Sequence, residues 1–246
     1  MEFARIFLII YLGHKMADSK PAHLGMDLKS WAVLASFFLL LAWQTDLGPA
    51  LLVFLVFGAL FLTVQFSWQK AAFYAGLAFA GLGGSLFCFP HLRTRILAWL
   101  LPWDYLESKG YQVLQGLFAL NAGGAVGRGL GAGLAGVIPA VHTDYLLALM
   151  GEEMGLLGTF SVIIVYLGLA FWAFRLLSGT ADSALRLVGL GFTLLLHCQV
   201  FLVVGGILRL VPFTGMTLPF VSYGSSSLIA QLWMLGMLTG LGREKL

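Results

Sequence analysis

Charged side chains are scarce in this sequence of 246 residues, where Asp, Glu, Lys and Arg together make up only 10%. A soluble globular domain carries about 25% of charged residues. Hydrophobic residues account for 60% of the chain, so the composition excludes a water-soluble fold. Apolar runs near the length that crosses a hydrocarbon core of roughly 30 Å recur along the whole sequence. The composition therefore predicts an all-α polytopic membrane protein.

Cysteine is also rare, since Cys88 and Cys198 are the only two, and each lies in an apolar segment without a CxxC neighbour. We interpret both as packing residues and expect neither a disulfide nor a metal pair. No GxxxxGK[ST], HExxH or GxSxG pattern occurs, so the usual sequence motifs of ATPases, zinc proteases and serine hydrolases are absent from the sequence. Residues 131–136, GAGLAG, match GxGxxG, but no strand precedes them, and we expect packing glycines rather than a nucleotide site.

Seven apolar segments are candidate transmembrane spans. They cover about residues 3–13, 30–45, 47–67, 71–90, 154–177, 186–208 and 219–241. The first holds roughly a dozen residues and covers little more than half a bilayer at about 1.5 Å per residue. The run is therefore either a re-entrant segment or a span whose beginning is missing, and we favour the missing beginning. Because no linker or tandem repeat interrupts the sequence, we expect residues 1–246 to form a single integral membrane domain.

Basic residues near the ends of spans are retained in the cytoplasm, and this rule orients the chain. One set of connections carries Lys15, Lys20, Lys29, Lys70, Arg175, Arg186, Arg243 and Lys245. The opposite set carries fewer basic residues, namely Arg93, Arg95, Lys109, Arg128 and Arg209. The first set is predicted to be cytoplasmic, which also explains the net charge of +3 without a nucleic-acid partner. The long loop of about residues 91–153 is then predicted to face outward, with an amphipathic segment, ILAWLLPWDYL, at the headgroup level.

Polar side chains at membrane depth are the candidate functional residues, because an ionisable group there costs several kcal/mol and normally faces a cavity or a partner. Arg5 lies in the first apolar run, Asp46 between the second and third, and Asp144 just before YLLALM. Each has a structural alternative. Arg5 could snorkel to the interface, Asp46 could cap a helix, and Thr143 with Asp144 could cap the next one.

Two glutamates follow Asp144 at a spacing that separates their roles. Glu152 and Glu153 lie two helical turns further on, rotated by roughly 80° and 180° from Asp144 in a continuous helix. The three carboxylates therefore cannot all serve one site. We expect the glutamates to order the helix, to pair or to face solvent. His197, which interrupts a later span, is interpreted as a structural hydrogen-bond partner between helices.

Several segments together resemble one family of membrane proteins. They are MEFARIFLIIYLG, WQTDLGPALL, YQVLQGLFALNAGGAVGRGLGAG, HTDYLLALMGEEMGLLG and PFTGMTLPFVSYGSSSL, which follow one another along almost the entire chain. The sequence is similar to the SEDS family (shape, elongation, division and sporulation). The resemblance implies the C-terminal part of a ten-span fold, with the chain beginning inside the fourth span and lacking the first three.

The resemblance also implies an enzyme of bacterial cell wall synthesis, a glycosyltransferase that polymerises lipid II at the outer face of the cytoplasmic membrane. Asp144 of the HTD motif is then the general base toward the acceptor hydroxyl. The implied substrate-binding residues are Arg5, Asp46, Gln115, Arg128, His142 and Thr143. Arg5 and Arg128 would supply positive charge to the pyrophosphate of the leaving undecaprenyl carrier.

Cofactors and partners follow from the same resemblance. The resemblance makes no cofactor certain, and a divalent cation could share with the arginines the task of supplying positive charge, although no ligand cluster in the sequence defines its site. The implied protein partner is a class B penicillin-binding transpeptidase. Elongation, division and sporulation all remain open as the process served. Two rival functions also remain open: a flippase for the lipid-linked precursor, for which intramembrane Arg5 and Asp46 would line a polar pathway, and a non-catalytic scaffold for the transpeptidase.

Overall fold

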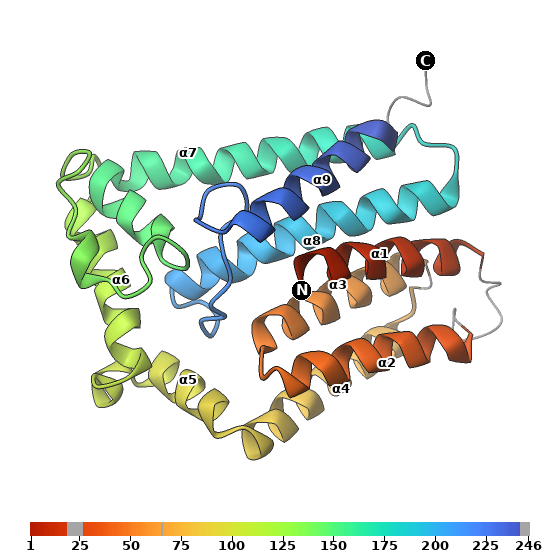
Figure 1. The fold of residues 1–246 in the computed structure, drawn as a ribbon, viewed down its shortest axis with the longest axis horizontal. Coiled ribbons are helices and arrows are strands. Elements are labelled where there is room, and N and C mark those ends of the chain that lie inside the picture. The colour runs from red at the N-terminus through yellow and green to blue at the C-terminus, as the bar shows by residue number, and fades with distance from the viewer. Residues whose placement is uncertain (19–26, 65, 242–246) are drawn as a thin grey trace. The chain divides into compact units, whose positions relative to one another are not determined.

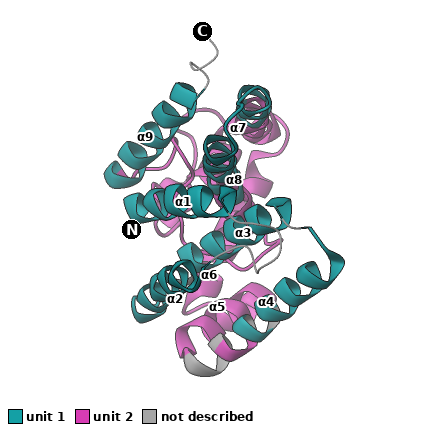
Figure 2. Cartoon of the chain, turned by 90° about the vertical axis from the view of Figure 1, so that its right-hand side faces the viewer, with its two compact units in different colours: residues 1–82, 169–198, 225–246 teal, residues 83–168, 199–224 magenta. Residues whose placement is uncertain are grey.

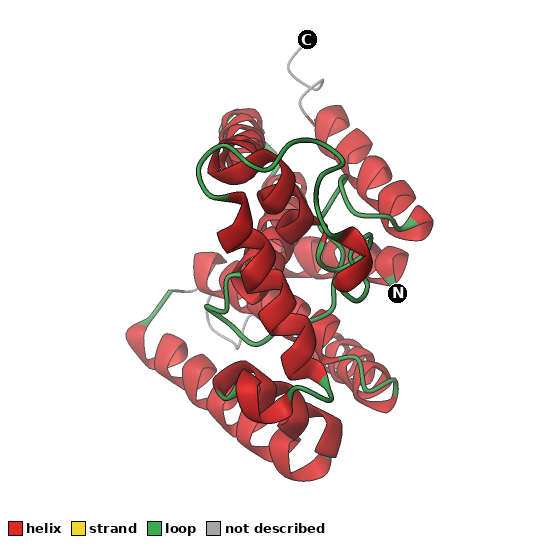
Figure 3. Cartoon of the chain, turned by 90° about the vertical axis from the view of Figure 1, so that its left-hand side faces the viewer, coloured by secondary structure: helices red, strands yellow, loops and turns green. Residues whose placement is uncertain are grey.

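The computed structural model describes residues 1–18, 27–64 and 66–241 (Figure 1). Within these ranges the chain consists of helices and loops, and no described residue belongs to a strand (Figure 3). The all-helical prediction is therefore confirmed for the described part. Lys20, Arg243 and Lys245, which the orientation prediction uses, lie outside the described residues.

Contacts divide the chain into two compact units, coloured separately in Figure 2. Unit 1 comprises residues 1–82, 169–198 and 225–246, and unit 2 comprises residues 83–168 and 199–224. The helices with residues in unit 1 are α1 (Glu2–Ala17), α2 (Leu28–Trp43), α3 (Leu47–Val64), α4 (Trp68–Cys88), α7 (Leu146–Leu177), α8 (Ser183–Ile207) and α9 (Ser225–Leu241). Unit 2 adds α5 (Pro90–Leu100), η1 (Pro102–Tyr105), α6 (Lys109–Gly123) and η2 (Ala135–Val137), and contains the first part of α7 and the end of α8.

Apolar packing holds unit 1 together. Tyr74 of α4 lies against three phenylalanines of α3, with ring centroids 5.3 to 6.0 Å apart. Trp233 of α9 contacts the rings of Phe3 and Phe7 on α1 at 5.9 and 5.4 Å. Aromatic pairs at such separations contribute about 0.5 to 1.5 kcal/mol beyond the area they bury. The Tyr74 contacts join α4 to α3, and the Trp233 contacts join α1 to α9, which lies far from it in the sequence.

Helix starts in the chain follow local capping rules. Asp27 is the N-cap of α2, and its carboxylate accepts a hydrogen bond from the Ser30 backbone N–H at 3.1 Å and another from the Ser30 hydroxyl. Both bonds lower the pKa of Asp27, with the hydroxyl contributing most. Pro90 and Pro102 stand in the first turns of α5 and η1, where the missing N–H removes no helical bond.

The seven predicted apolar segments each coincide with a helix, namely α1 to α4 and α7 to α9. α7 begins at Leu146, where YLLALM follows Asp144, and so extends upstream of the span predicted over residues 154–177. α9 begins at Ser225 rather than near residue 219, because residues 219–224 form a turn. Only α7 and α8, of 32 and 25 residues, are long and apolar enough among the described helices to cross a membrane by themselves. The count of seven spans stays a prediction.

The surface of α7 fits a lipid environment. Phe160, Ile164, Val165, Leu167 and Phe171 are between 57% and 69% exposed. A contiguous apolar face of this kind is rare on a soluble monomer, whereas hydrocarbon tails solvate it without cost.

Candidate functional site

The turn before α7 positions Asp144 through its backbone. Ala140 has a positive φ of 53°, and its carbonyl accepts backbone N–H groups from Thr143 at 3.3 Å, Asp144 at 2.9 Å and Tyr145 at 3.4 Å. A non-glycine residue in this region of φ is uncommon and is retained where surrounding structure requires it. Three donors converging on one carbonyl therefore hold the Asp144 backbone in a single place.

The Asp144 carboxylate is partly buried and accepts no hydrogen bond from any residue within the described ranges. The Thr143 hydroxyl donates backward to the Ala140 carbonyl at 3.2 Å instead of forward to the helix. The capping alternative for Thr143 and Asp144 is thus not adopted in this structure. A carboxylate held by its backbone, with both oxygens free, is available to accept a proton from a ligand.

Gly215 faces this carboxylate, and sequence analysis missed it. Its φ is 70°, and a Cβ on it would lie 3.6 Å from Asp144 Oδ2. Any larger side chain would narrow the approach to Asp144 and would strain the backbone. The contact joins Gly215 to Asp144, which is far from it in the chain, so no local pattern predicts it. The only local signal is the proline and glycine content around Gly215, which is typical of a turn.

The segment that carries Gly215 is tied to the rest of unit 2 by hydrogen bonds to its backbone. Gln199 Nε2 donates to the Thr217 carbonyl at 2.9 Å, and the Tyr166 hydroxyl donates to the Pro219 carbonyl. The Tyr223 N–H donates to the His142 carbonyl at 2.9 Å, which joins the segment to the HTD motif itself. The His142 side chain is exposed.

Tyr145 directly follows Asp144 in the chain. Its side chain is fully buried, and its ring lies 4.7 Å from that of Phe213. Gly116 of α6 makes room for the ring, since a Cβ there would be 2.5 Å from Tyr145 Cε1. The hydroxyl has no partner among the described residues. Burial raises the pKa of Tyr145, and the Asp144 carboxylate raises it further, so this hydroxyl stays neutral.

Arg128 and Glu152 form an ion pair in the same unit. Arg128 Nη1 donates to Glu152 Oε1 at 2.8 Å, and the Leu134 N–H donates to Glu152 Oε2 at 3.0 Å. Glu152 is only 2% exposed, whereas the Arg128 side chain is 43% exposed. Of the two glutamates after Asp144, Glu152 is therefore the paired one.

The glutamines of α6 differ in their contacts. Gln112 Nε2 donates to the Pro139 carbonyl at 3.0 Å and so connects α6 to the turn before Asp144. Gln115, the predicted substrate ligand one turn later, is partly buried, and its amide has no hydrogen bond to any described residue.

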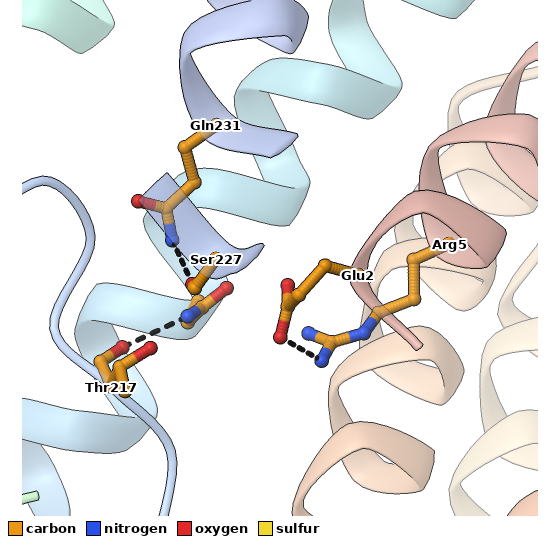
Figure 4. Close-up of polar contacts among 6 residues, drawn as sticks. Glu2, Arg5, Thr217, Ser227 and Gln231 are labelled. Carbon is orange, nitrogen blue, oxygen red and sulfur yellow. Dashed lines mark hydrogen bonds and ion pairs between the residues drawn. The ribbon is translucent and has the colours of Figure 1, made fainter. Parts of the chain in front are cut away.

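Arg5 and Asp46 belong to unit 1. Arg5 is 3% exposed and donates from Nη2 to Glu2 Oε1 at 2.5 Å, while Nε and Nη1 have no partner among the described residues (Figure 4). Arg5 is thus buried rather than snorkelling to an interface. On α9, Gln231 donates to the Ser227 hydroxyl at 2.8 Å (Figure 4). Asp46 is exposed in the turn between α2 and α3.

No group of three His, Cys, Asp or Glu side chains in the described part of the chain could hold a metal ion. A hard divalent cation such as Mg²⁺ commonly uses one or two carboxylates together with substrate phosphates. A cation at this site would therefore depend on oxygens of the ligand.

Known proteins resemble this chain over most of its length. A family model described as cell cycle protein, FtsW/RodA/SpoVE, matches residues 1–245. The peptidoglycan glycosyltransferase RodA of Mycobacterium tuberculosis is 36% identical over 96% of this chain and 54% of its own length. Stage V sporulation protein E of Bacillus subtilis is 29% identical over 99% of this chain and 67% of its own length. The chain thus spans about half the length of the RodA relatives it matches.

Solved structures show the same fold. A chain from a study of how a peptidoglycan synthase complex coordinates polymerization and crosslinking superposes with a TM-score of 0.76 and 28% identity, covering 99% of this chain and 69% of the other. RodA of Thermus thermophilus superposes with a TM-score of 0.65 at 24% identity. With the family model matched over nearly every residue and the fold shared, the chain belongs to the FtsW, RodA and SpoVE family, the SEDS family that its motifs indicated.

Proposed function

We propose that the protein is a peptidoglycan glycosyltransferase that polymerises lipid II at the outer face of the bacterial cytoplasmic membrane. The observation that supports this most is the partly buried Asp144 carboxylate, held by its backbone beside Gly215 with both oxygens unbonded to any described residue. The names of the RodA and FtsW relatives, peptidoglycan glycosyltransferases, agree with it.

In the proposed reaction the 4-hydroxyl of an incoming GlcNAc attacks the anomeric carbon of the MurNAc at the end of the growing chain. Asp144 takes the hydroxyl proton, the new glycosidic bond forms, and the bond to undecaprenyl pyrophosphate breaks with the electron pair leaving on the phosphate oxygen. A single carboxylate suffices because a diphosphate departs as a stable anion, whereas a glycosidase needs a second acid for its leaving oxygen. General base catalysis of this kind contributes about 10² to 10⁴ in rate.

The remaining predicted residues are proposed as substrate ligands. Arg5 keeps two unpaired guanidinium nitrogens, and the half-exposed Arg128 has donors besides the one bound to Glu152, so both can contribute to pyrophosphate binding. The other proposed ligands are Asp46, Gln115, His142 and Thr143.

The proposed partner is a class B penicillin-binding transpeptidase that cross-links the strands made here. The similar chain in a complex that coordinates polymerization and crosslinking supports this pairing. The relatives include RodA, FtsW and a sporulation protein, so the proposal covers elongation, division and sporulation alike.

The decisive experiment replaces Asp144 by Asn and measures glycan synthesis from lipid II by the purified protein in proteoliposomes. Asp144→Asn keeps the size of the side chain and removes its basicity, so glycan synthesis should fall at least 100-fold while the thermal unfolding midpoint stays unchanged. Asp104→Asn, an exposed aspartate of η1, is the matched control and should retain activity. Undiminished polymerisation by Asp144→Asn would overturn the assignment, and movement of labelled lipid between leaflets without glycan synthesis would favour the flippase.

A further inference from the structure

The first part of α7 is separated from the rest by a break. Gly155 has φ 67° and ψ −162°, which no α-helix contains. In an unbroken helix the N–H groups of Leu156 and Leu157 would donate to the carbonyls of Glu152 and Glu153. The break frees all four groups from these helical bonds, and backbone polar groups of a folded chain are nearly always paired with another partner.

A glycine-rich loop replaces every one of these bonds. Residues 124–129 run past the break and supply two carbonyls and two N–H groups to it. The four bonds are Leu156 N to Gly124 O at 3.0 Å, Leu157 N to Ala125 O at 3.3 Å, Arg128 N to Glu152 O at 2.9 Å, and Gly129 N to Glu153 O at 3.0 Å. The loop thus stands in for the missing helical turn.

Close approach of the two backbones requires glycine at two positions. A Cβ on Gly127, where φ is 87°, would be 2.2 Å from the Glu153 carbonyl oxygen, and one on Gly155 would be 2.4 Å from the Gly127 nitrogen. Gly131 has a similar φ of 76°, but a Cβ there would meet nothing within 4 Å. Gly127 and Gly131 both have a backbone conformation that favours glycine, but of these two only Gly127 would collide with a neighbour if it carried a Cβ.

Glu152 binds this loop and the chain that follows it. Its buried carboxylate accepts hydrogen bonds from the Arg128 guanidinium and from the Leu134 N–H. A buried carboxylate that accepts two such bonds is satisfied, and the pairing accounts for an acid that the proposed reaction does not use.

We propose that residues 124–134 form a positioning clasp, which fixes the direction of the first part of α7 and so the place of Asp144, with Glu152 and Gly127 as its positioning residues. This inference rests on the proposed function of Asp144 as the base. Neither residue touches a reacting atom; both act through the helix that follows Asp144.

The first part of α7 is long enough that a small tilt at Gly155 would displace Asp144. Asp144 lies eleven residues before Gly155, or about 16 Å along a helix at about 1.5 Å per residue. A tilt of about 10° at the break would therefore move Asp144 by about 3 Å, and a misplacement of about 1 Å can cost about 10² in rate. Packing of α6 against Tyr145 and Gly151 limits sideways motion of the first part of α7. The clasp then joins α6 and the first part of α7 to the second part of α7.

The test compares Gly127→Ala with Gly131→Ala in the membrane-reconstituted protein, because both carry the same backbone strain and only the first collides with the break. A spin label on a cysteine replacing the 80% exposed Leu130 reports loop mobility, in a background without Cys88 and Cys198. Lipid II polymerisation gives kcat and KM. We expect Gly127→Ala to free the label and lower kcat at least tenfold, with a smaller rise in KM because Arg128 moves with the loop, while Gly131→Ala behaves as the parent protein.

Glu152→Gln provides a second variant that keeps the size of the side chain, with Glu153→Gln as its control. Glu152→Gln should free the label partially and lower kcat without changing its pH profile, with a smaller rise in KM because the ion pair to Arg128, a proposed pyrophosphate ligand, is lost. Glu153→Gln should change none of these quantities. A label as rigid in Gly127→Ala as in the parent, or a freed label with unchanged kcat, would overturn the clasp.

The two proposals fail in different ways. If the parent protein makes no glycan, the function proposed for Asp144 falls, and the positioning role falls with it, although the label still reports whether the loop is held. If the parent protein is active and the variants Gly127→Ala and Glu152→Gln are as active as the parent, the function stands and the positioning role falls.

Discussion

Tyr145 is the most confined side chain next to Asp144, with Phe213 on its ring and Gly116 where another residue would collide with it. Its hydroxyl is buried without a hydrogen bond to any described residue. A buried hydroxyl without a partner costs about 1 to 3 kcal/mol. Tyrosine at this position therefore makes the folded protein less stable than phenylalanine would.

Tyr145→Phe should accordingly leave the free energy of unfolding unchanged or raise it by about 1 kcal/mol at neutral pH. The pKa of Tyr145 is raised in the folded protein, so the unfolded chain loses this proton first as the pH climbs past about 10. The parent protein should lose stability in that alkaline range, and Tyr145→Phe should lose less. Thermal unfolding in detergent between pH 7 and pH 11 measures both effects; a lower midpoint for the variant at neutral pH would mean that the hydroxyl is bonded.

Gly116→Ala tests the same confinement from the other side. The new methyl would start 2.5 Å from the Tyr145 ring, and overpacking of this kind costs about 1 to 3 kcal/mol. We expect a lower unfolding midpoint and reduced polymerisation. Gly168→Ala in α7, where a Cβ meets nothing within 4 Å, should instead be stabilised by the usual helical preference for alanine, and equal effects at both sites would contradict the packing argument.

At the scale of elements, the end of α5 depends on one arginine. Arg209 donates from Nε to the Trp99 carbonyl and from Nη2 to the Leu100 carbonyl, each at 2.7 Å, and Trp99 Nε1 donates back to the Arg209 carbonyl at 3.0 Å. The last carbonyls of a helix have no partner within it, and a cation there also suits the helix dipole. The reciprocal pair therefore fixes α5 to the chain that leaves α8.

Arg209→Gln should destabilise the protein by about 1 to 2 kcal/mol, because two charge-assisted bonds to carbonyls are lost from a partly exposed site. The tryptophan fluorescence should shift to the red as Trp99 becomes more hydrated. Arg93→Gln on the same helix, an exposed residue whose side chain has no described partner, is the control and should change neither quantity. A similar loss from both variants would indicate a general charge effect instead of a helix cap.

Helix identity was predictable from local sequence, whereas the break inside α7 was not. The length of each apolar run indicated α1 to α4 and α7 to α9, since a bilayer obliges a crossing backbone to satisfy its hydrogen bonds within one helix. The start of α7 at Leu146 agrees with a helix that begins at YLLALM, whereas its break at Gly155 was not predicted. The break depends on hydrogen bonds with a distant loop, which the spacing of apolar residues does not reveal.

At the scale of the whole molecule, the orientation of the chain remains a prediction that labelling can test. Residues 91–153 should face outward and the turn between α7 and α8 should face the cytoplasm, by the distribution of basic residues. That residues 1–246 act as one integral membrane domain stays a prediction as well.

Single cysteines at the exposed positions Ser108 and Ser178 provide the test, in a background without Cys88 and Cys198. A membrane-impermeant maleimide added to intact cells should label Ser108→Cys, because that residue precedes α6 in the outward loop. It should label Ser178→Cys only after the membrane is permeabilised. The reverse pattern would turn the chain over and place Asp144 in the cytosol, which would also remove the proposed function.

The sequence by itself determined the class of protein and its family, because hydropathy and contiguous motifs are local properties that survive without knowledge of packing. It also singled out Asp144. Only the tertiary structure decided that Gly215 faces that acid, that Tyr145 packs on Phe213, and that Arg128 pairs with Glu152. These neighbours meet because helices pack and a broken helix needs substitute hydrogen bonds, and such requirements join residues that no short sequence pattern connects.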